Sequence, residues 1–131
     1  MDRVVFSGNL GGVEEDGFTA GLHGLHVHAG TDIIDSCVDL GGHMSIYGDE
    51  IHGPPSATPP NRHQGDLGNI EVNDYGVGNV WISDVVVSLK SSDANYIGGR
   101  GMVLHALEDQ PNTQPTGAAG ARVGCCIITV D

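Results

Sequence analysis

The placement of the histidines constrains this chain of 131 residues more than any other feature. His26 and His28 flank a valine in a run typical of a β-strand, and side chains two apart on a strand point to the same face. Both imidazoles can therefore reach one ion from a rigid platform. His105 lies on another strand-like run far along the chain, so the fold must bring the two runs together.

More potential ligands stand in the Gly- and Pro-rich loop between these runs. Imidazole suits copper and zinc, and three imidazoles with one carboxylate are the ligand types of a closed zinc site. We therefore predict a copper set of His26, His28, His43 and His105, and a zinc set of His43, His52, His63 and Asp66. The competing interpretation is that they are ordinary polar loop residues and scattered histidines.

If His43 belongs to both sets, its two ring nitrogens would bridge two metals. That arrangement needs the imidazolate form of the ring, which two cations together make accessible. One redox-active and one redox-inactive metal, side by side, is the simplest use for all of these ligands.

The chain is strongly acidic, with a net charge of −12 from 17 acidic and 5 basic residues. This balance argues against nucleic acid and anionic lipid as partners, because phosphate neutralisation needs clustered Lys and Arg. No apolar stretch is long enough for a membrane span, and the start lacks the apolar region of a signal peptide. We expect a cytoplasmic protein; a secreted or periplasmic location stays open if a signal peptide was removed.

Short β-rich runs separated by turn signals predict an all-β sandwich or barrel. The length fits a single domain over 1–131. We expect strands at 3–10, 22–29, 67–73, 78–83, 85–89, 101–106 and 122–130. A hairpin turn is expected at 73–76, and the one weak helical turn near 83–85. Two long loops, 30–65 and 107–121, are expected to be functional.

The cysteines leave two alternatives. Cys125 and Cys126 are neighbours in a strand-like run, so their side chains face opposite ways and at most one of them can easily meet Cys37. A bridge to Cys125 would close a long loop and add stability by restricting the unfolded chain. The other alternative is three buried free thiols, which is common in intracellular proteins.

Taken together, several ordered segments resemble the copper/zinc superoxide dismutases. The matching segments are 21–28 (GLHGLHVH), 41–43 (GGH), 62–69 (RHQGDLGN), 102–106 (MVLHA) and 117–125 (GAAGARVGC). The resemblance covers about residues 21 to 130 and implies a Greek-key β-barrel with copper on the first ligand set and zinc on the second. It also implies disproportionation of superoxide to dioxygen and hydrogen peroxide.

The same resemblance implies roles for residues outside the ligand sets. It pairs Cys37 with Cys125, and it makes Asp109 the acid that links His26 and His52. Arg122 would attract and orient the anion beside copper. His43 would take up a proton when copper is reduced and return it afterwards. His23 matches a histidine that braces loops, and Cys126 has no role in the resemblance. The alternative functions are a non-catalytic copper-binding or carrier domain on the same fold, and an interaction protein.

The sequence departs from the family in two places. Only 25 residues precede His26, too few for three leading strands, so we expect the first β-hairpin to be missing and 13–18 to form an extra acidic loop. We expect open sheet edges near 3–10 and 122–130, and association through them as a homodimer or other oligomer. The loop from Asp109 to Arg122 is short and contains no Lys, which predicts weak long-range steering of an anion.

Overall fold

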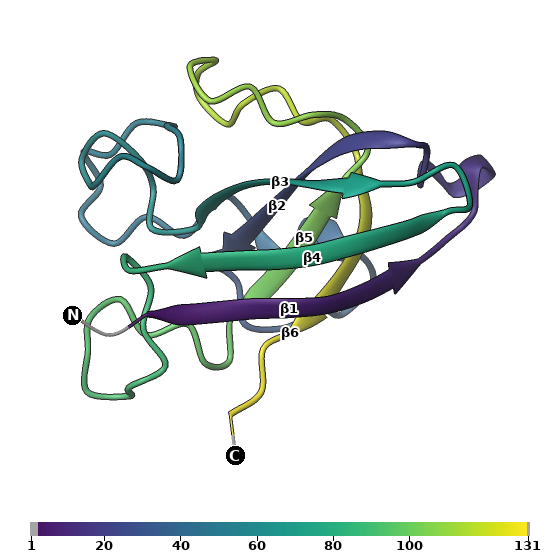
Figure 1. The fold of residues 1–131 in the computed structure, drawn as a ribbon. Helices are drawn as coiled ribbons and strands as arrows, with labels where there is room; N and C mark the ends of the chain where they lie inside the picture. Colours follow the sequence, from purple (N-terminus) through teal and green to yellow (C-terminus); the bar gives the residue numbers. More distant parts are fainter. Residues whose placement is uncertain (1–2, 131) are drawn as a thin grey trace.

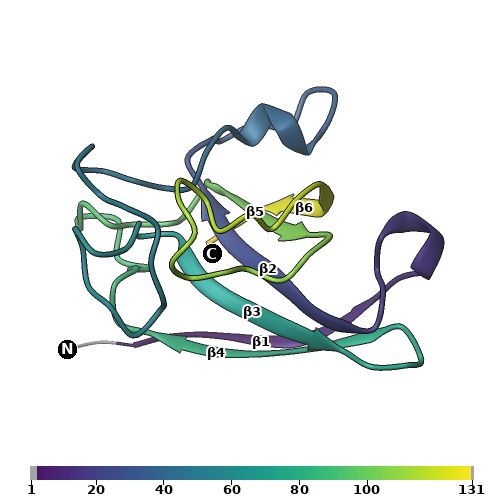
Figure 2. The same cartoon turned by 90° about the horizontal axis from the view of Figure 1, so that it is seen from above.

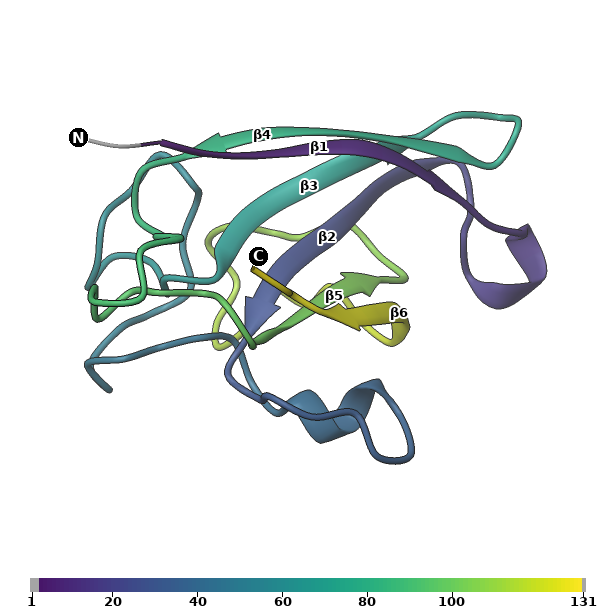
Figure 3. The same ribbon diagram turned by 90° about the horizontal axis from the view of Figure 1, so that it is seen from below.

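The computed structural model describes residues 3–130, and these fold around one antiparallel sheet (Figure 1). Its strands are β1 (Val4–Gly11), β2 (Gly21–His28), β3 (Asp66–Val72), β4 (Val77–Asp84), β5 (Gly101–His105) and β6 (Arg122–Ile127). They lie in the order β1-β4-β3-β2-β5-β6, and the sheet curls into a half-barrel (Figures 2 and 3). The all-β prediction is confirmed. The 3-10 helices η1 (Glu14–Asp16) and η2 (Cys37–Leu40) lie in loops, and residues 3–130 contain no α-helix.

The predicted hairpin turn at 73–76 is confirmed. It joins β3 to β4, and the side-chain oxygen of Asn73 accepts hydrogen bonds from the backbone N–H groups of Tyr75 and Val77, at 2.9 and 3.0 Å. The Asn side chain thus replaces a backbone acceptor at the turn, as Asn does in many loops.

One predicted strand is wrong. Residues 85–89 leave the sheet after β4 and make only an isolated bridge, between Ser88 and Tyr96. The cause is the carboxylate of Asp84, which accepts hydrogen bonds from the backbone N–H groups two and three residues later. This local bonding competes with a sheet ladder and turns the chain outward. The weak helical turn expected near 83–85 is not found: Ser83 and Asp84 belong to β4, and the chain bends only from Val85 on.

The two faces of the curled sheet have different chemistry. Leu25 and Val27 of β2 belong to the apolar clusters of the inner face. His26 and His28 alternate with them and point to the outer face. The antiparallel register of β2 and β5 places His105 on that outer face too. The long loops that follow β2 and β5 cover this convex side of the sheet (Figure 2).

A buried arginine ties the first long loop to the sheet. Arg62 is fully buried and donates to Asp84 Oδ1 at the end of β4, at 2.7 Å. Its other N–H groups donate to the backbone carbonyls of Pro55, His63 and Gln64, at 2.9 to 3.0 Å. The guanidinium therefore makes these hydrogen bonds to groups inside the protein, and they offset the loss of water around a buried charge.

We predict that Arg62→Ala lowers the free energy of unfolding by about 3–5 kcal/mol, because it leaves the Asp84 carboxylate buried without its cation. Urea unfolding measures the change. Arg3→Ala is the matched control: Arg3 is exposed, and its side chain makes one hydrogen bond to the described residues, to Ser83. The control should change stability by no more than about 0.5 kcal/mol. Equal losses in the two variants would contradict this role of Arg62.

Candidate metal centre

The structure brings the predicted ligand side chains into two adjacent groups on the outer face. One group is His26, His28, His43 and His105; the other is His43, His52, His63 and Asp66. Within each group, the candidate ligand atoms all lie within 4.8 Å of one another. These are the sets that the sequence predicts, and His43 belongs to both.

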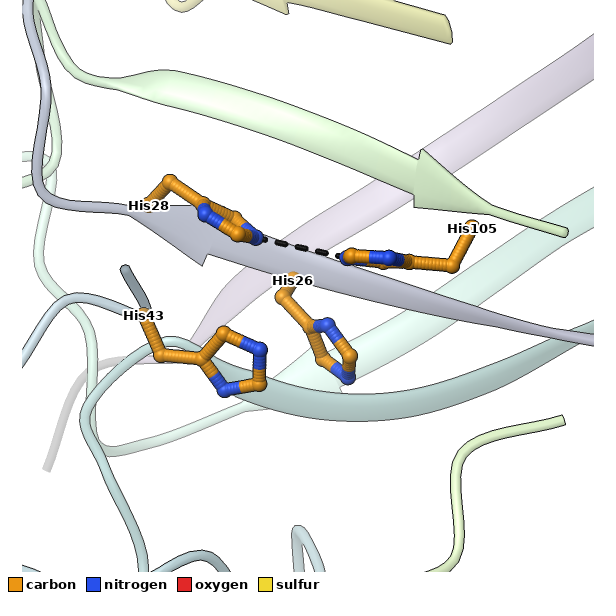
Figure 4. A group of neighbouring side chains, drawn as sticks. All are labelled: His26, His28, His43 and His105. Atoms are coloured by element: carbon orange, nitrogen blue, oxygen red, sulfur yellow. Dashed lines mark hydrogen bonds between the residues drawn. The ribbon is translucent and has the colours of Figure 1, made fainter. Parts of the chain in front are cut away.

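Figure 4 shows the four imidazoles of the first group. Each has one ring nitrogen within hydrogen-bond distance of an oxygen, which for His43 belongs to Asp66. His26 Nε2 lies 2.7 Å from a carboxylate oxygen of Asp109. His28 Nδ1 and His105 Nδ1 lie 2.8 and 3.1 Å from backbone carbonyl oxygens. Because these oxygens can only accept, each fixed nitrogen carries the proton. The second nitrogen of each neutral ring is left with a lone pair.

These lone pairs face one another. His28 Nε2 and His105 Nε2 are 3.4 Å apart, and the buried His26 Nδ1 has no hydrogen-bond partner among the described residues. Burial lowers the pKa of His26 to about 4 and that of His28 to about 3, and it lowers the pKa of His105 as well. The rings are therefore neutral at pH 7. A cation between them turns mutual repulsion into coordination, so this group fits a metal that prefers imidazole.

The second group surrounds one carboxylate oxygen. Asp66 Oδ1 lies 2.7, 3.1 and 3.2 Å from the Nδ1 atoms of His43, His52 and His63. Burial of Asp66 opposes its charge, but hydrogen bonds from these rings hold its pKa well below the usual range. Three nitrogens and an anionic oxygen that converge in this way are the donor set of a tetrahedral zinc site.

Asp109 connects the two groups. One of its carboxylate oxygens lies 2.7 Å from His26 Nε2 and 2.9 Å from His52 Nε2. Burial of His52 disfavours its charged form, yet hydrogen bonds to Asp109 and Asp66 outweigh this and raise its pKa to about 9. Asp109 thus orients a ring in each group, as acids behind metal-binding histidines do.

Two residues that the sequence did not single out hold Asp109 in place. The side-chain oxygen of Asn69 accepts from the Asp109 backbone N–H at 2.7 Å, and its amide donates to the Asp109 carbonyl at 3.1 Å. Gly117 lies against Asp109 and His52, where a Cβ atom would be only 2.3 Å from the carboxylate. Asn69 lies in the segment 62–69 that carries the family resemblance, but nothing in that segment indicated that Asn69 contacts Asp109.

Arg122 lies beside the first group and is fixed by the loop that contains η2. Its guanidinium donates to the carbonyl oxygens of Cys37 and Gly41, at 2.8 and 2.6 Å. The Gly41 carbonyl also accepts from His28 Nδ1, so it links the guanidinium to a ligand ring. Arg122 therefore places a positive charge beside the histidines, and this charge contributes to the lowered pKa of His28.

The cysteines and His23 take the places that the resemblance implied. Cys37 and Cys125 form a disulfide that joins η2 to β6, whereas Cys126 is a free, exposed thiol. The two ring nitrogens of His23 lie 2.7 Å from the His105 carbonyl oxygen and 2.6 Å from that of Thr19. His23 therefore braces two loops and contributes no free nitrogen to the ligand groups.

Comparisons with known proteins agree with this geometry. A family model described as copper/zinc superoxide dismutase matches residues 4–128. The extracellular copper-zinc superoxide dismutase of Drosophila melanogaster is 36% identical over 125 residues, which cover 90% of this chain and 66% of that protein. The copper-zinc superoxide dismutase of Onchocerca volvulus is 38% identical, with 89% and 77% covered.

Two further proteins extend the comparison. The copper-zinc superoxide dismutase 5 of Dictyostelium discoideum is 39% identical, with 97% of this chain and 81% of the relative covered. The crystal structure of the clock protein EA4 superposes with a TM-score of 0.82 at 32% identity, covering 95% of this chain and 77% of that one. The chain spans about two thirds of the length of the Drosophila relative.

We predict that removing the disulfide, by Cys37→Ser with Cys125→Ser, lowers the free energy of unfolding by about 4–5 kcal/mol. The reason is the separation of 88 residues between the two cysteines, which makes the closed loop long in the unfolded chain. Thermal and urea unfolding measure the loss. Cys126→Ser is the control and should behave like the wild type. If the double variant and Cys126→Ser lose the same free energy of unfolding, the disulfide does not stabilise the fold.

Proposed function

This chain belongs to the copper/zinc superoxide dismutase family, and from that premise we propose that it disproportionates superoxide. Two superoxide anions and two protons give one dioxygen and one hydrogen peroxide. The observation that carries the proposal is the pair of buried ligand groups that share His43, with lone pairs converging in the first and Arg122 beside it.

We assign each ligand group to one metal. Copper would be held by His26, His28, His43 and His105, and zinc by His43, His52, His63 and Asp66. When bound, copper supplies the one-electron redox chemistry, and zinc supplies a fixed positive charge without redox chemistry. The donor types fit this division, because the first group is all imidazole and the second includes a carboxylate.

The residues of the chain would contribute charge, orientation and a proton. The Arg122 guanidinium attracts the anion to the first group and orients it there, which offsets the net charge of −12 locally. His43 Nε2 can hold a proton for the half-reaction that forms hydrogen peroxide, while its Nδ1 stays directed at the second group. Asp109 keeps the rings of His26 and His52 in the orientation that binding needs.

A non-catalytic copper-binding or carrier domain is the alternative function. A carrier needs the imidazoles, but it has no use for a guanidinium that two carbonyl oxygens fix beside them. The geometry of Arg122 therefore favours the enzyme.

The remaining assignments concern organisation and location. We propose a single domain over 1–131, supported by the single sheet and the match over 4–128, and association through the free edges of β1 and β6 as a homodimer or with another partner.

No helix in residues 3–130 is long and apolar enough to cross a membrane. The cytoplasmic location stays a prediction; the disulfide and the extracellular relative favour an oxidising compartment instead.

We predict that His105→Ala removes copper and abolishes superoxide turnover, since it deletes one of the four imidazoles of the first group. Elemental analysis and a turnover assay on the same sample measure both. His63→Ala is the matched variant: it belongs only to the second group and should lose zinc while copper still binds. Turnover that persists unchanged in His105→Ala would end the assignment.

For Arg122→Ala, we predict that both metals stay bound and that turnover falls about tenfold or more, because the local attraction for the anion is lost. Lys90→Ala is the control. It removes the same charge from an exposed position outside the ligand groups and should leave the rate unchanged. An Arg122→Ala rate equal to that of the control would refute the role of Arg122.

We also predict that the wild-type rate changes by less than about twofold between low and physiological ionic strength. The loop from Asp109 to Arg122 contains no Lys, so few charges act on the anion from a distance. Turnover measured over a salt series at fixed pH tests this. A steep fall with added salt would show that long-range steering operates.

A further inference from the structure

The two long loops that cover the ligand groups, 30–65 and 107–121, meet at one ligand residue (Figure 2). Within residues 3–130, every hydrogen bond that joins these loops ends on His52. One is the bond between its ring and Asp109, described above. The other two bind the backbone of His52 and come from Gln114, which belongs to neither ligand group.

The side-chain amide of Gln114 holds both backbone groups of His52. Its Oε1 accepts from the His52 N–H at 2.8 Å, and its Nε2 donates to the His52 carbonyl oxygen at 2.8 Å. An amide side chain has one acceptor and one donor face, as a peptide group has, so Gln114 pairs with His52 as a neighbouring strand would. His52 lies outside every strand, and its N–H and carbonyl have no other partner in residues 3–130.

Burial makes this pairing important for the second ligand group. His52 is only 1% exposed, so without the Gln114 amide a buried backbone donor and a buried acceptor would lose their partners. Such groups carry a free-energy penalty, which the segment can relieve by opening locally to water. Gln114 itself lies at the surface, so its side chain can be changed without disturbing the core.

The tip of the second loop supports Gln114 from behind. The Gln110 N–H donates to the Gly117 carbonyl at 2.8 Å, and the Gly117 N–H donates to the Thr113 carbonyl at 2.7 Å. These bonds close the turn 110–117 around Gln114. Gly117 also packs against His52, where a Cβ atom would lie only 2.5 Å from Nε2. The turn therefore presents the Gln114 amide to His52 from an ordered support.

We propose that Gln114 is a positioning residue for the second ligand group: its amide fixes His52 and thereby slows the release of the zinc assigned to that group. The proposal rests on the metal assignment above and adds a residue that neither ligand set contains. An imidazole can leave an ion only if its ring moves away, and a backbone held by two hydrogen bonds opens less often. Within residues 3–130, the side chain of Gln114 bonds only to His52, so the effect should be selective for zinc.

The test follows zinc release in time from the chain loaded with both metals, using a chromogenic chelator at fixed pH. Gln114→Ala should release zinc at least about tenfold faster, because both hydrogen bonds are lost. Gln114→Glu keeps the shape but places an ionised oxygen against the His52 carbonyl oxygen, and it should release zinc at least as fast as Gln114→Ala.

Gln110→Ala is the matched control. Gln110 is an exposed glutamine of the same turn, and its side chain bonds Thr113 within that turn. This variant should release zinc at the wild-type rate. Circular dichroism of each variant checks that it is folded.

A purely structural role of Gln114 would give a different pattern, in which both metals leave faster. Copper release from the same samples is therefore recorded with a copper chelator, and it should stay at the wild-type rate in Gln114→Ala. Equal acceleration of both metals, unchanged zinc release, or the same acceleration in Gln110→Ala would overturn the proposal.

The release assay is independent of superoxide. A chain that holds both metals and shows the expected release pattern, but has no turnover, would leave the role of Gln114 standing and reject only the enzymatic function. A chain that takes up no zinc would reject both the metal assignment and this role.

Discussion

The convergence of imidazole lone pairs on the outer face of the sheet is the interaction on which the rest of this structure depends. His28 Nε2 and His105 Nε2 face each other at 3.4 Å, and oxygens behind the rings keep the protons on the far nitrogens. Such an arrangement has low energy only around a cation. The nearby carboxylate of Asp66, surrounded by three further ring nitrogens, poses the same requirement a short distance away.

The sheet can carry these buried histidines because its two faces have different roles. Alternation along β2 puts Leu25 and Val27 into the apolar interior and leaves His26 and His28 on a surface that the long loops then cover. The loops are themselves fixed by buried polar contacts, chiefly those of Arg62 to Asp84 and to neighbouring carbonyls. The ligand rings are thus held rigidly before any ion arrives, so little ordering remains to oppose binding.

Much of this could be predicted from sequence, because strand alternation and ligand chemistry are local. The spacing of His26 and His28 sets their common face, and the two ligand sets followed from residue type. The failures are also physical. Residues 85–89 have strong β propensity, but the Asp84 side chain bonds the backbone and diverts the chain. The pairing of Cys37 stayed open on the residues alone, because alternation shows only that its two candidates face opposite ways.

Partners distant in the sequence were the other failure. Asn69 supports Asp109 across 40 residues, and Arg62 meets Asp84 across 22, and no local pattern encodes either contact. The open side of the half-barrel shows the converse case. Sheet edges near 3–10 and 122–130 were expected from the sequence, and in the described residues β1 and β6 are the edge strands of the sheet.

The most direct test of the account is a crystal structure of the metal-loaded chain, with anomalous diffraction recorded at the copper and zinc absorption edges. We expect a copper peak among His26, His28 and His105 and a zinc peak beside Asp66, with the ring of His43 between the two and one nitrogen directed at each. A single peak, or two peaks that do not share the His43 ring, would contradict it.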